Sequence, residues 1–393
     1  MRLGSGQYRC VNPIGCTCRK AQNNESPCLP GRKGHRGGTN YLVEMKEELN
    51  ESGLNRILAD LVTKRHIYGA VFYVSSDDGS IDLEGASGDF KRDSRYYIAS
   101  VNKLLVSAVT LRLCSEGKLD LRDKISEYLS GEVIRGLHLH RGKDYSSSIT
   151  IAHLMSHTSG LPCYLTDRQA NGRRVMSELE AGIDQAWPIE RVVQETKRMK
   201  THFPPGKEGK ARYSDTNYRI LGSVLESITG DPVNVVLKNL FQELSMSETH
   251  VCEDLDDTNF VPIRYKSEAI QIPLYLTSTQ DDVISTAVDQ MKFLKSFFNG
   301  VFFPKERLHE LEKWNNVFFP FSYGIGLQKF SLPRVLSPLH PVPDMVGHCG
   351  STGSVDFYVP DRGIYLTGSL NQQARPNVAF QTMIRIVGKT GHK

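Results

Sequence analysis

Long apolar runs are missing from this sequence. No stretch of eighteen apolar residues occurs in it, and its first residues lack the apolar core of a signal peptide. We therefore expect neither a membrane span nor secretion, and we predict a cytoplasmic protein. Apolar residues make up 39% of the 393 residues and charged residues 23%, which is typical of a globular chain with a two-lobed body or two domains.

Most of the chain has no large excess of positive or negative charge. The formal net charge is +4, but residues 1–40 hold seven basic residues against one acidic residue, so the rest of the chain carries −2. A nearly neutral body argues against a nucleic-acid-binding groove. Residues 1–40 are rich in Gly, Asn, Pro and Arg without periodicity, and we predict that they form a solvated, disordered leader.

The cysteines and histidines of the sequence also lack the spacing that is typical of metal ligands. Four cysteines lie in the leader, at Cys10, Cys16, Cys18 and Cys28, and their spacing matches no common zinc site, although metal or disulfide use stays an alternative. The other four are scattered, as reduced thiols of an intracellular protein would be. His153 and His157 lie four residues apart without a further ligand at suitable spacing, so we interpret both as structural. We expect no metal and no cofactor.

Hydrophobic periodicity predicts strands at both ends of the chain and helices between them. An amphipathic helix is predicted at 41–66, a hairpin at 69–74 and 81–86, a buried helix at 100–113, a helix at 218–228, a helix capped by Ser285, strands at 322–328, 354–359 and 363–370, and a last helix at 376–386. This order predicts an α/β (α+β) fold in which an antiparallel sheet flanked by helices is built from both chain ends. The predicted parts are a sheet domain of residues 41–118 and 285–393 and a mostly helical lobe of residues 119–284, whose polar stretch 163–210 suits a cleft wall.

The buried helix carries a candidate nucleophile at its start. Ser100 and Lys103 are three residues apart, so one helical turn places the hydroxyl and the amine on one face, within contact range. A serine hydroxyl needs a base to become a nucleophile, and an amine in a dry site beside a helix N-terminus can have a lowered pKa. Lys103 could then act as that base, whereas the alternative is an ordinary helix cap at Ser100.

Three separated segments make the case for chemistry together: S-V-N-K at 100–103, Y-S-D at 213–215 and H-C-G-S-T-G at 348–353. With H-T-S-G-L-P at 157–162 and I-S-T at 284–286, the chain resembles the serine β-lactamase and penicillin-binding-protein-like hydrolases over residues 50–390. The resemblance is strongest to the branch that holds class C β-lactamases, family VIII carboxylesterases and D-aminopeptidases.

The resemblance implies a role for each matching residue. Ser100 would be the acylated nucleophile, and Lys103 would share its proton with Tyr213, which would be a phenolate general base and later a general acid. The backbone N–H groups of Ser100 and Ser351 would form the oxyanion hole. Gly350 would let the strand approach the substrate closely.

Two residues depart from the β-lactamase pattern. His348 stands where those enzymes carry lysine, so it would be cationic only part of the time and would hold a substrate carboxylate weakly. Asp215 replaces an asparagine and can only accept hydrogen bonds, so it would pair with Lys103 or accept from an N–H or ammonium group of the substrate.

The departures favour a serine hydrolase that cleaves small carboxylic esters through an acyl-serine intermediate. The alternatives are a D-amino-acid amidase or peptidase, a β-lactamase, an acyltransferase, and a ligand-binding protein without turnover. The expected partner is a small-molecule ester or amide, and the sequence leaves the oligomeric state open.

Overall fold

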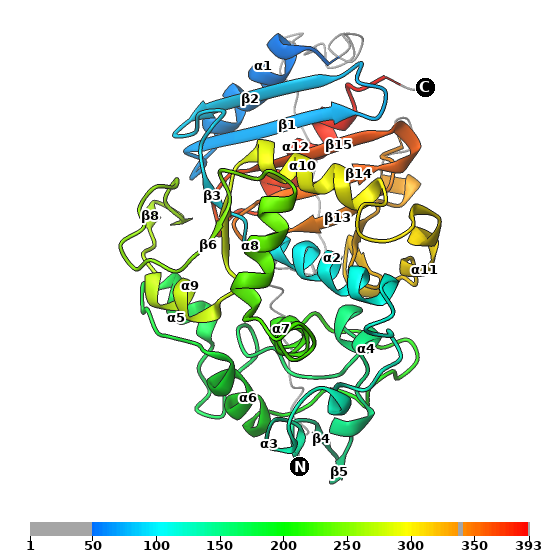
Figure 1. Cartoon of the computed structure of the whole chain (residues 1–393). Coiled ribbons are helices and arrows are strands. Elements are labelled where there is room, and N and C mark those ends of the chain that lie inside the picture. The colour runs from blue at the N-terminus through cyan, green and yellow to red at the C-terminus, as the bar shows by residue number, and fades with distance from the viewer. Residues whose placement is uncertain (1–48, 337–340, 392–393) are drawn as a thin grey trace, which may run out of the picture.

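The computed structural model describes residues 49–336 and 341–391. The predicted leader, its four cysteines and the first residues of the predicted helix 41–66 lie outside the described residues. Figure 1 shows a sheet covered by helices, with further helices continuing below it.

The main sheet contains eight antiparallel strands in the described residues, in the order β10-β11-β12-β13-β14-β15-β1-β2. These strands are β1 (Gly69–Ser76), β2 (Asp82–Gly88), β10 (Asn315–Phe318), β11 (Phe321–Tyr323), β12 (Gln328–Phe330), β13 (Met345–Cys349), β14 (Val355–Val359) and β15 (Ile364–Ser369). Strand β1 pairs with β15 on one side and with β2 on the other. The predicted hairpin and the prediction of one antiparallel sheet built from both chain ends are therefore confirmed.

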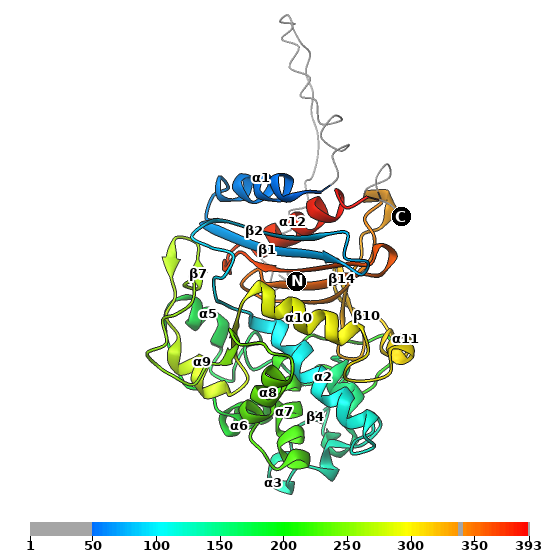
Figure 2. The same ribbon diagram turned by 45° about the horizontal axis from the view of Figure 1, so that its top comes forward.

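Helices cover both faces of this sheet (Figure 2). Helices α1 (Glu51–Val62) and α12 (Asn377–Val387) lie on one face, and α10 (Ala287–Phe298) lies on the other. The alternation of β1 explains why both faces are apolar: Phe72 and Val74 pack with α1 and α12, whereas Val71 packs into the core that contains α10.

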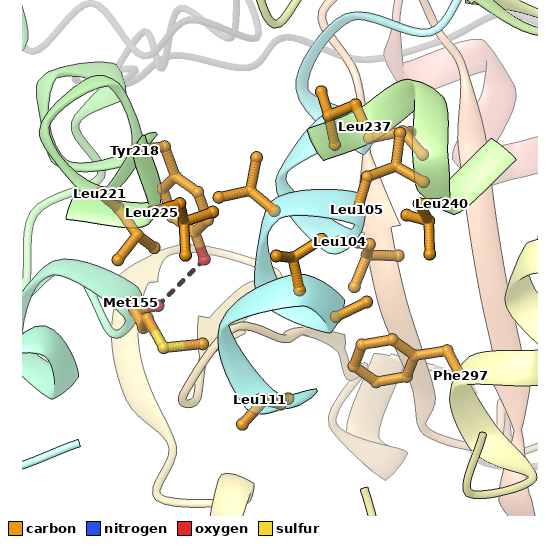
Figure 3. Close-up of a cluster of buried hydrophobic side chains, with 14 of the residues drawn as sticks. Leu104, Leu105, Leu111, Met155, Tyr218, Leu221, Leu225, Leu237, Leu240 and Phe297 are labelled. Atoms are coloured by element: carbon orange, nitrogen blue, oxygen red, sulfur yellow. Dashed lines mark hydrogen bonds between the residues drawn. The ribbon is translucent and has the colours of Figure 1, made fainter. Parts of the chain in front are cut away.

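Helix α2 (Asn102–Ser115) runs through the core beside α7 (Asp215–Thr229) and α8 (Val233–Glu243). Figure 3 shows apolar side chains around it from α7, α8 and α10: Leu221, Leu225, Leu237, Leu240 and Phe297. Leu104 and Leu105 of α2 are fully buried, and full burial of one such side chain stabilises the fold by about 1.5–3 kcal/mol. The core anchors the start of α2, where the candidate nucleophile lies.

The remaining elements are short. The helices are α3 (Gly131–Ile134), α4 (Ile151–Met155), α5 (Val175–Glu180), α6 (Ile189–Arg198), α9 (Pro273–Thr279) and α11 (Leu308–Leu311). The strands are β3 (Tyr96–Tyr97), β4 (Leu139–His140), β5 (Lys143–Asp144), β6 (His250–Val251), β7 (Arg264–Tyr265), β8 (Glu268–Ala269) and β9 (Val283–Ser285). Strands β3, β9 and β6 form a small second sheet that leads into the site.

The predicted cap at Ser285 is wrong by one residue. Ser285 ends β9, and its hydroxyl hydrogen-bonds to the Thr249 hydroxyl at 2.7 Å. The side chain of Thr286 instead accepts from the N–H of Asp289 and caps α10.

Across residues 49–336 and 341–391, no single helix has the length and apolar composition needed to cross a membrane. Helices α7 and α8 reach that length and composition only as a pair, and they are bent by 79° relative to each other.

Candidate active site

Ser100 lies in a single 3-10 turn (Ala99–Val101) between β3 and α2. Ala99 has a φ of 49°, a left-handed conformation that residues with a side chain rarely adopt. The hydroxyl of Ser354, in the loop after β13, donates to the carbonyl of Ile98 over 2.6 Å and holds the turn in place. The strained turn places Ser100 on the wall of a cleft.

Lys103 contacts both Ser100 and Asp215. Its Nζ lies 3.1 Å from Oγ of Ser100 and 2.6 Å from Oδ1 of Asp215, so the predicted contact between hydroxyl and amine is confirmed. Burial by itself would lower the pKa of Lys103, but the Asp215 carboxylate, with Tyr213, outweighs burial and raises this pKa well above its ordinary value. The prediction of a lowered lysine pKa is therefore wrong, and Lys103 is an ammonium at neutral pH.

Tyr213 lies beside the same ammonium, with Nζ of Lys103 5.4 Å from the centroid of its ring. Burial raises the pKa of Tyr213; Lys103 opposes this effect, Asp215 adds to it, and the pKa ends well above 10. The expected phenolate is thus wrong for the resting site, because burial, with the charge of Asp215, outweighs the effect of the lysine charge. The buried hydroxyl makes no hydrogen bond of good geometry within the described part of the chain, although Ser100 and Lys103 lie close enough to affect its pKa.

Asp215 is the first residue of α7, and both of its carboxylate oxygens are engaged. Oδ1 accepts from Lys103 and Oδ2 accepts from Sγ of Cys163 over 3.2 Å. Pairing with Lys103 was one of the two alternatives that the sequence left open. The side chains of this ion pair are only 6% and 13% exposed, so solvent screens their attraction little. Burial, with the charge of Asp215, raises the pKa of Cys163 to about 12, which keeps it a thiol.

The backbone at the predicted oxyanion hole is open toward the cleft. Ser100 and Ser351 both border the cleft, and neither N–H donates to another backbone carbonyl among residues 49–336 and 341–391. A Cβ on Gly350 would lie 2.6 Å from the carbonyl oxygen of Ile98 and 2.9 Å from Cβ of Ala99. Glycine is therefore required for the loop after β13 to approach the Ser100 turn, and this approach leaves two N–H groups available for a negatively charged oxygen.

A Gly350→Ala variant is expected to acylate about tenfold more slowly, because the added methyl group pushes the Ser351 N–H away from the Ser100 turn. Overpacking of this kind also costs about 1–3 kcal/mol of stability. Stopped-flow acylation by an activated ester, together with thermal unfolding, measures both effects. Gly222→Ala is the control, since a Cβ there meets only a side chain at 3.7 Å. An unchanged acylation rate in Gly350→Ala would argue against the oxyanion role of this loop.

His348 is neutral and fully buried, and it does not border the cleft. Its Nδ1 lies 2.8 Å from the carbonyl of Cys349, so Nδ1 carries the proton, and its Nε2 accepts from the Tyr323 hydroxyl at 2.9 Å. Burial, with the charge of Lys103, lowers the pKa of His348 to about 3. The predicted partial positive charge is therefore wrong. Neighbours on a strand point to opposite faces, and here Cys349 borders the cleft while His348 does not.

The cleft measures about 1050 Å³ including the solvent at its mouth. Its border residues outside the predicted motifs include Tyr164, Arg219, Tyr275, Asp281, Asp282, Phe318, Gln328 and Phe380. Sequence reasoning missed these because none belongs to a spaced motif. Gln328 accepts from the backbone N–H of Cys349 at 3.1 Å and from its Sγ at 3.0 Å, while burial raises the pKa of Cys349 to about 12. Cys349 is therefore a thiol at neutral pH, which makes it a poor nucleophile.

The two histidines that the sequence places four residues apart do not form a ligand pair. Nδ1 of His153 accepts from the N–H of Thr150 in the cap of α4, and Nδ1 of His157 accepts from the N–H of Ser214. Throughout the described ranges no group of three His, Cys, Asp or Glu side chains is arranged to hold a metal ion.

A partly buried serine, a buried lysine and a partly buried tyrosine meet beside the antiparallel sheet, with the backbone N–H groups of Ser100 and Ser351 at the cleft, and this arrangement is typical of serine hydrolases. The family model for Beta-lactamase matches residues 54–386, most of the sequence. The chain belongs to the β-lactamase family, in the serine β-lactamase and penicillin-binding-protein-like superfamily.

Individual relatives are distant. A putative penicillin-binding protein of Bacillus subtilis is 24% identical over 241 residues, which is 59% of this chain and 52% of the relative. The chain thus spans about half the length of this curated relative and less of others. A D-stereospecific amidohydrolase from Streptomyces sp. has a similar structure, with a TM-score of 0.69, 24% identity and coverage of 86% and 98%. EstCE1, a hydrolase with promiscuous acyltransferase activity, gives a TM-score of 0.68, 19% identity and coverage of 86% and 97%.

Proposed function

We propose that this protein hydrolyses small, uncharged carboxylic esters through a covalent acyl-enzyme on Ser100. The observation that carries this proposal is the buried ion pair between Lys103 and Asp215, with 2.6 Å between Nζ and Oδ1. It sets the charge of the site and therefore the kind of substrate that the site accepts. EstCE1, a structural neighbour that is a hydrolase, supports the proposal.

The charge balance of the cleft disfavours substrates that carry a carboxylate. Lys103 is neutralised by Asp215, and the guanidinium of Arg219 is engaged by Asp281 and the carbonyl of Thr279. These are the only lysine and arginine side chains among the described residues that border the cleft. A penicillin or a peptide with a free C-terminus would bring its carboxylate to a site without an available cation, whereas an ester brings no charge.

Acylation follows from the protonation states of the resting site. Oγ of Ser100 attacks the carbonyl carbon. Lys103 gives one of its protons to Asp215 as it takes the proton of Ser100, so it remains an ammonium. The N–H groups of Ser100 and Ser351 stabilise the tetrahedral oxyanion. When the C–O bond to the leaving group breaks, the phenol of Tyr213 protonates the departing alkoxide, which leaves as an alcohol. Deprotonation of Ser100 therefore needs no phenolate.

Deacylation restores the starting charges. The Tyr213 phenolate left by the first step takes a proton from water, and the resulting hydroxide attacks the acyl carbon. Ser100 leaves as the alkoxide and regains its proton from Asp215 through Lys103. The acid is released, and the net change is an ester and water converted to an acid and an alcohol.

A second candidate is hydrolysis of D-amino-acid amides, which have no carboxylate but carry an ammonium group. Asp281 and Asp282 both border the cleft, and burial, with the charge of Asp281, raises the pKa of Asp282 to about 6. Asp281 pairs with Arg219, and the ionised form of Asp282 adds a second negative charge against the one guanidinium. This surplus of negative charge favours a cationic amine, and the protein of similar structure from Streptomyces sp. is a D-stereospecific amidohydrolase.

The test combines covalent labelling with substrate choice. The full chain and Ser100→Ala are exposed briefly to a fluorophosphonate and, separately, to a penicillin, and their intact masses are measured. Turnover is then compared for p-nitrophenyl butyrate, a D-amino-acid amide and the penicillin. The proposal requires one fluorophosphonate adduct that is lost in Ser100→Ala and fastest turnover of the ester. Faster turnover of the amide would support the second candidate, and absence of any adduct would contradict both.

A further inference from the structure

His157 has an unusual backbone for a buried residue. It follows α4 in the segment H-T-S-G-L-P, it is fully buried, and its φ is 57°. The left-handed conformation is unfavourable for a residue with a side chain, so the surroundings must hold it. Neither the predicted roles nor the mechanism above uses this residue.

His157 accepts three hydrogen bonds, and two of them come from the residues directly before and after Tyr213. Its carbonyl accepts from the N–H of Arg212 at 2.9 Å, and its Nδ1 accepts from the N–H of Ser214 at 3.2 Å and from Nδ2 of Asn217 at 3.1 Å. The residues before and after Tyr213 are thus both tied to one histidine. The left-handed φ turns the carbonyl and the side chain of His157 toward the same segment.

The hydrogen bonds also fix the tautomer of the ring. A backbone N–H can only donate, so Nδ1 of His157 is the unprotonated nitrogen and Nε2 carries the proton. The hydroxyl of Ser159 donates to Oδ1 of Asn217 at 2.6 Å, which turns the Asn217 amide nitrogen toward the histidine. Burial lowers the pKa of His157 well below its ordinary value, and Lys103 and His348 lower it further. The ring is therefore neutral and has one defined orientation.

The ring itself packs against the phenol of Tyr213. The centroids of the two rings are 4.4 Å apart with an angle of 37° between their planes, and the ring of Tyr323 contacts His157 edge-on with 4.3 Å between centroids. Tyr323 also hydrogen-bonds to His348 and to Tyr218. Tyr213 is thus held through its neighbours' backbone and through its ring face, while its own hydroxyl is left free to reach the reacting atoms.

We infer that His157 is the positioning residue of Tyr213: it holds the phenol beside Lys103 and Ser100 so that the hydroxyl reaches the leaving group. The inference rests on the proposed function, because that function gives Tyr213 its role as a proton donor. A displacement of about 1 Å in such a group can cost about 100-fold in rate. The left-handed backbone of His157 is therefore retained, although it is unfavourable, because it gives the site the geometry that Tyr213 needs.

Two substitutions of His157 distinguish positioning from general support of the fold. The Oδ1 of asparagine lies where Nδ1 lies in histidine, and asparagine tolerates a left-handed φ, so His157→Asn keeps the acceptor for the Ser214 N–H. The Oε1 of glutamine corresponds to Nε2, so His157→Gln loses that acceptor at similar volume. His153→Gln is the matched control, because Nδ1 of His153 caps α4 and the ring does not touch Tyr213.

In steady-state hydrolysis of p-nitrophenyl butyrate, we expect kcat to fall about 30- to 100-fold in His157→Gln, with KM changed less than about twofold. His157→Asn should keep kcat within about fivefold of the wild type, and His153→Gln within about twofold, with similar Tm for both His157 variants. A kcat in His157→Gln equal to the wild type would overturn the inference. Equal losses in the two His157 variants would also overturn it, since they would indicate only structural support.

A second measurement does not depend on turnover. Ultraviolet titration of the tyrosines, with Tyr213→Phe subtracted, follows the ionisation of Tyr213 itself. The groups around this phenol are Lys103, Asp215, His348 and Tyr323. His157→Gln should bring the pKa of Tyr213 down toward 10, because a displaced phenol reaches water, and His157→Asn should leave it raised. If the wild type hydrolyses no ester, the proposed function fails, but this titration still decides whether His157 positions Tyr213; an unchanged pKa in His157→Gln would then overturn the inference.

Discussion

Lys103→Met is expected to slow ester acylation about 1000- to 10,000-fold. The methionine side chain fills a similar volume but has no group that can take the proton of Ser100 or pass it to Asp215. The loss should appear in the fluorophosphonate labelling rate as well as in turnover, because both reactions require an activated Ser100. Rapid-mixing labelling followed by intact-protein mass spectrometry measures it. A variant that retained more than about a tenth of the wild-type labelling rate would contradict the proposed proton path.

The same substitution should destabilise the fold, for a reason that can be separated from catalysis. Removing the ammonium leaves the carboxylate of Asp215 buried without a counter-ion, which costs about 3–5 kcal/mol. Because the pKa of Lys103 is raised in the folded state, the ion pair stabilises fully below the ordinary lysine pKa and is lost only as the pH rises through the higher folded value. The destabilisation is therefore visible at neutral pH in denaturant unfolding.

Two further variants act as controls for this prediction. Lys103→Met combined with Asp215→Asn removes both charges, so stability should return to within about 1–2 kcal/mol of the wild type while acylation stays lost. Lys292→Met removes the ammonium from another pair, in which Nζ lies 2.8 Å from Oδ1 of the buried Asp289 on α10. It should leave acylation unchanged, since this pair does not border the cleft.

Helical spacing and strand alternation predicted much of the fold and the nearest contact of the site. The three-residue spacing of Ser100 and Lys103 fixes their distance once the segment is a helix, and the 3.1 Å contact follows. The apolar positions of residues 100–113 predicted a helix buried on every side, and the described residues of α2 are buried almost throughout. Both inferences depend on local geometry, which a sequence specifies directly.

The protonation states of Lys103 and Tyr213 could not be predicted from the sequence, because they depend on a balance among charged groups from different segments of the chain. The pKa of Lys103 would be lowered by its burial alone, and only the position of Asp215, 112 residues later in the chain, reverses the direction. The orientation of His348 has a similar cause: a strand offers its neighbours opposite faces, and nothing in H-C-G says which of the two side chains faces the cleft. His157 was interpreted as structural because its contacts to Ser214 and Asn217 are visible only in three dimensions.

Asp215→Asn is expected to lower the pKa of Tyr213, with at least a tenfold rise in the ionisation constant of the phenol, equivalent to about 1.4 kcal/mol. Two effects act in the same direction: the charge of Asp215 itself raises the pKa of Tyr213, and Asp215 also neutralises the Lys103 ammonium that would lower it. Ester acylation at neutral pH should fall about 100-fold, because the final acceptor of the Ser100 proton is lost. What activity remains should rise with pH as the phenol becomes a phenolate base.

The ratio of amide or lactam hydrolysis to ester hydrolysis should rise in the same variant. An asparagine amide can donate to the carbonyl of an acyl-amide group, whereas a carboxylate only accepts, and the lysine ammonium is left available for a substrate carboxylate. Tyrosine titration against the Asp215→Asn, Tyr213→Phe double variant isolates the phenol, and pH–rate profiles with an ester and a penicillin give the ratio. Asp289→Asn is the control, because Asp289 pairs with Lys292 away from the cleft. It should change neither the pKa of Tyr213 nor the ratio of lactam to ester hydrolysis. An unaltered ratio in Asp215→Asn would mean that Asp215 does not set the preference of the site for esters, and the buried ion pair would lose its place as the basis of the proposed substrate class.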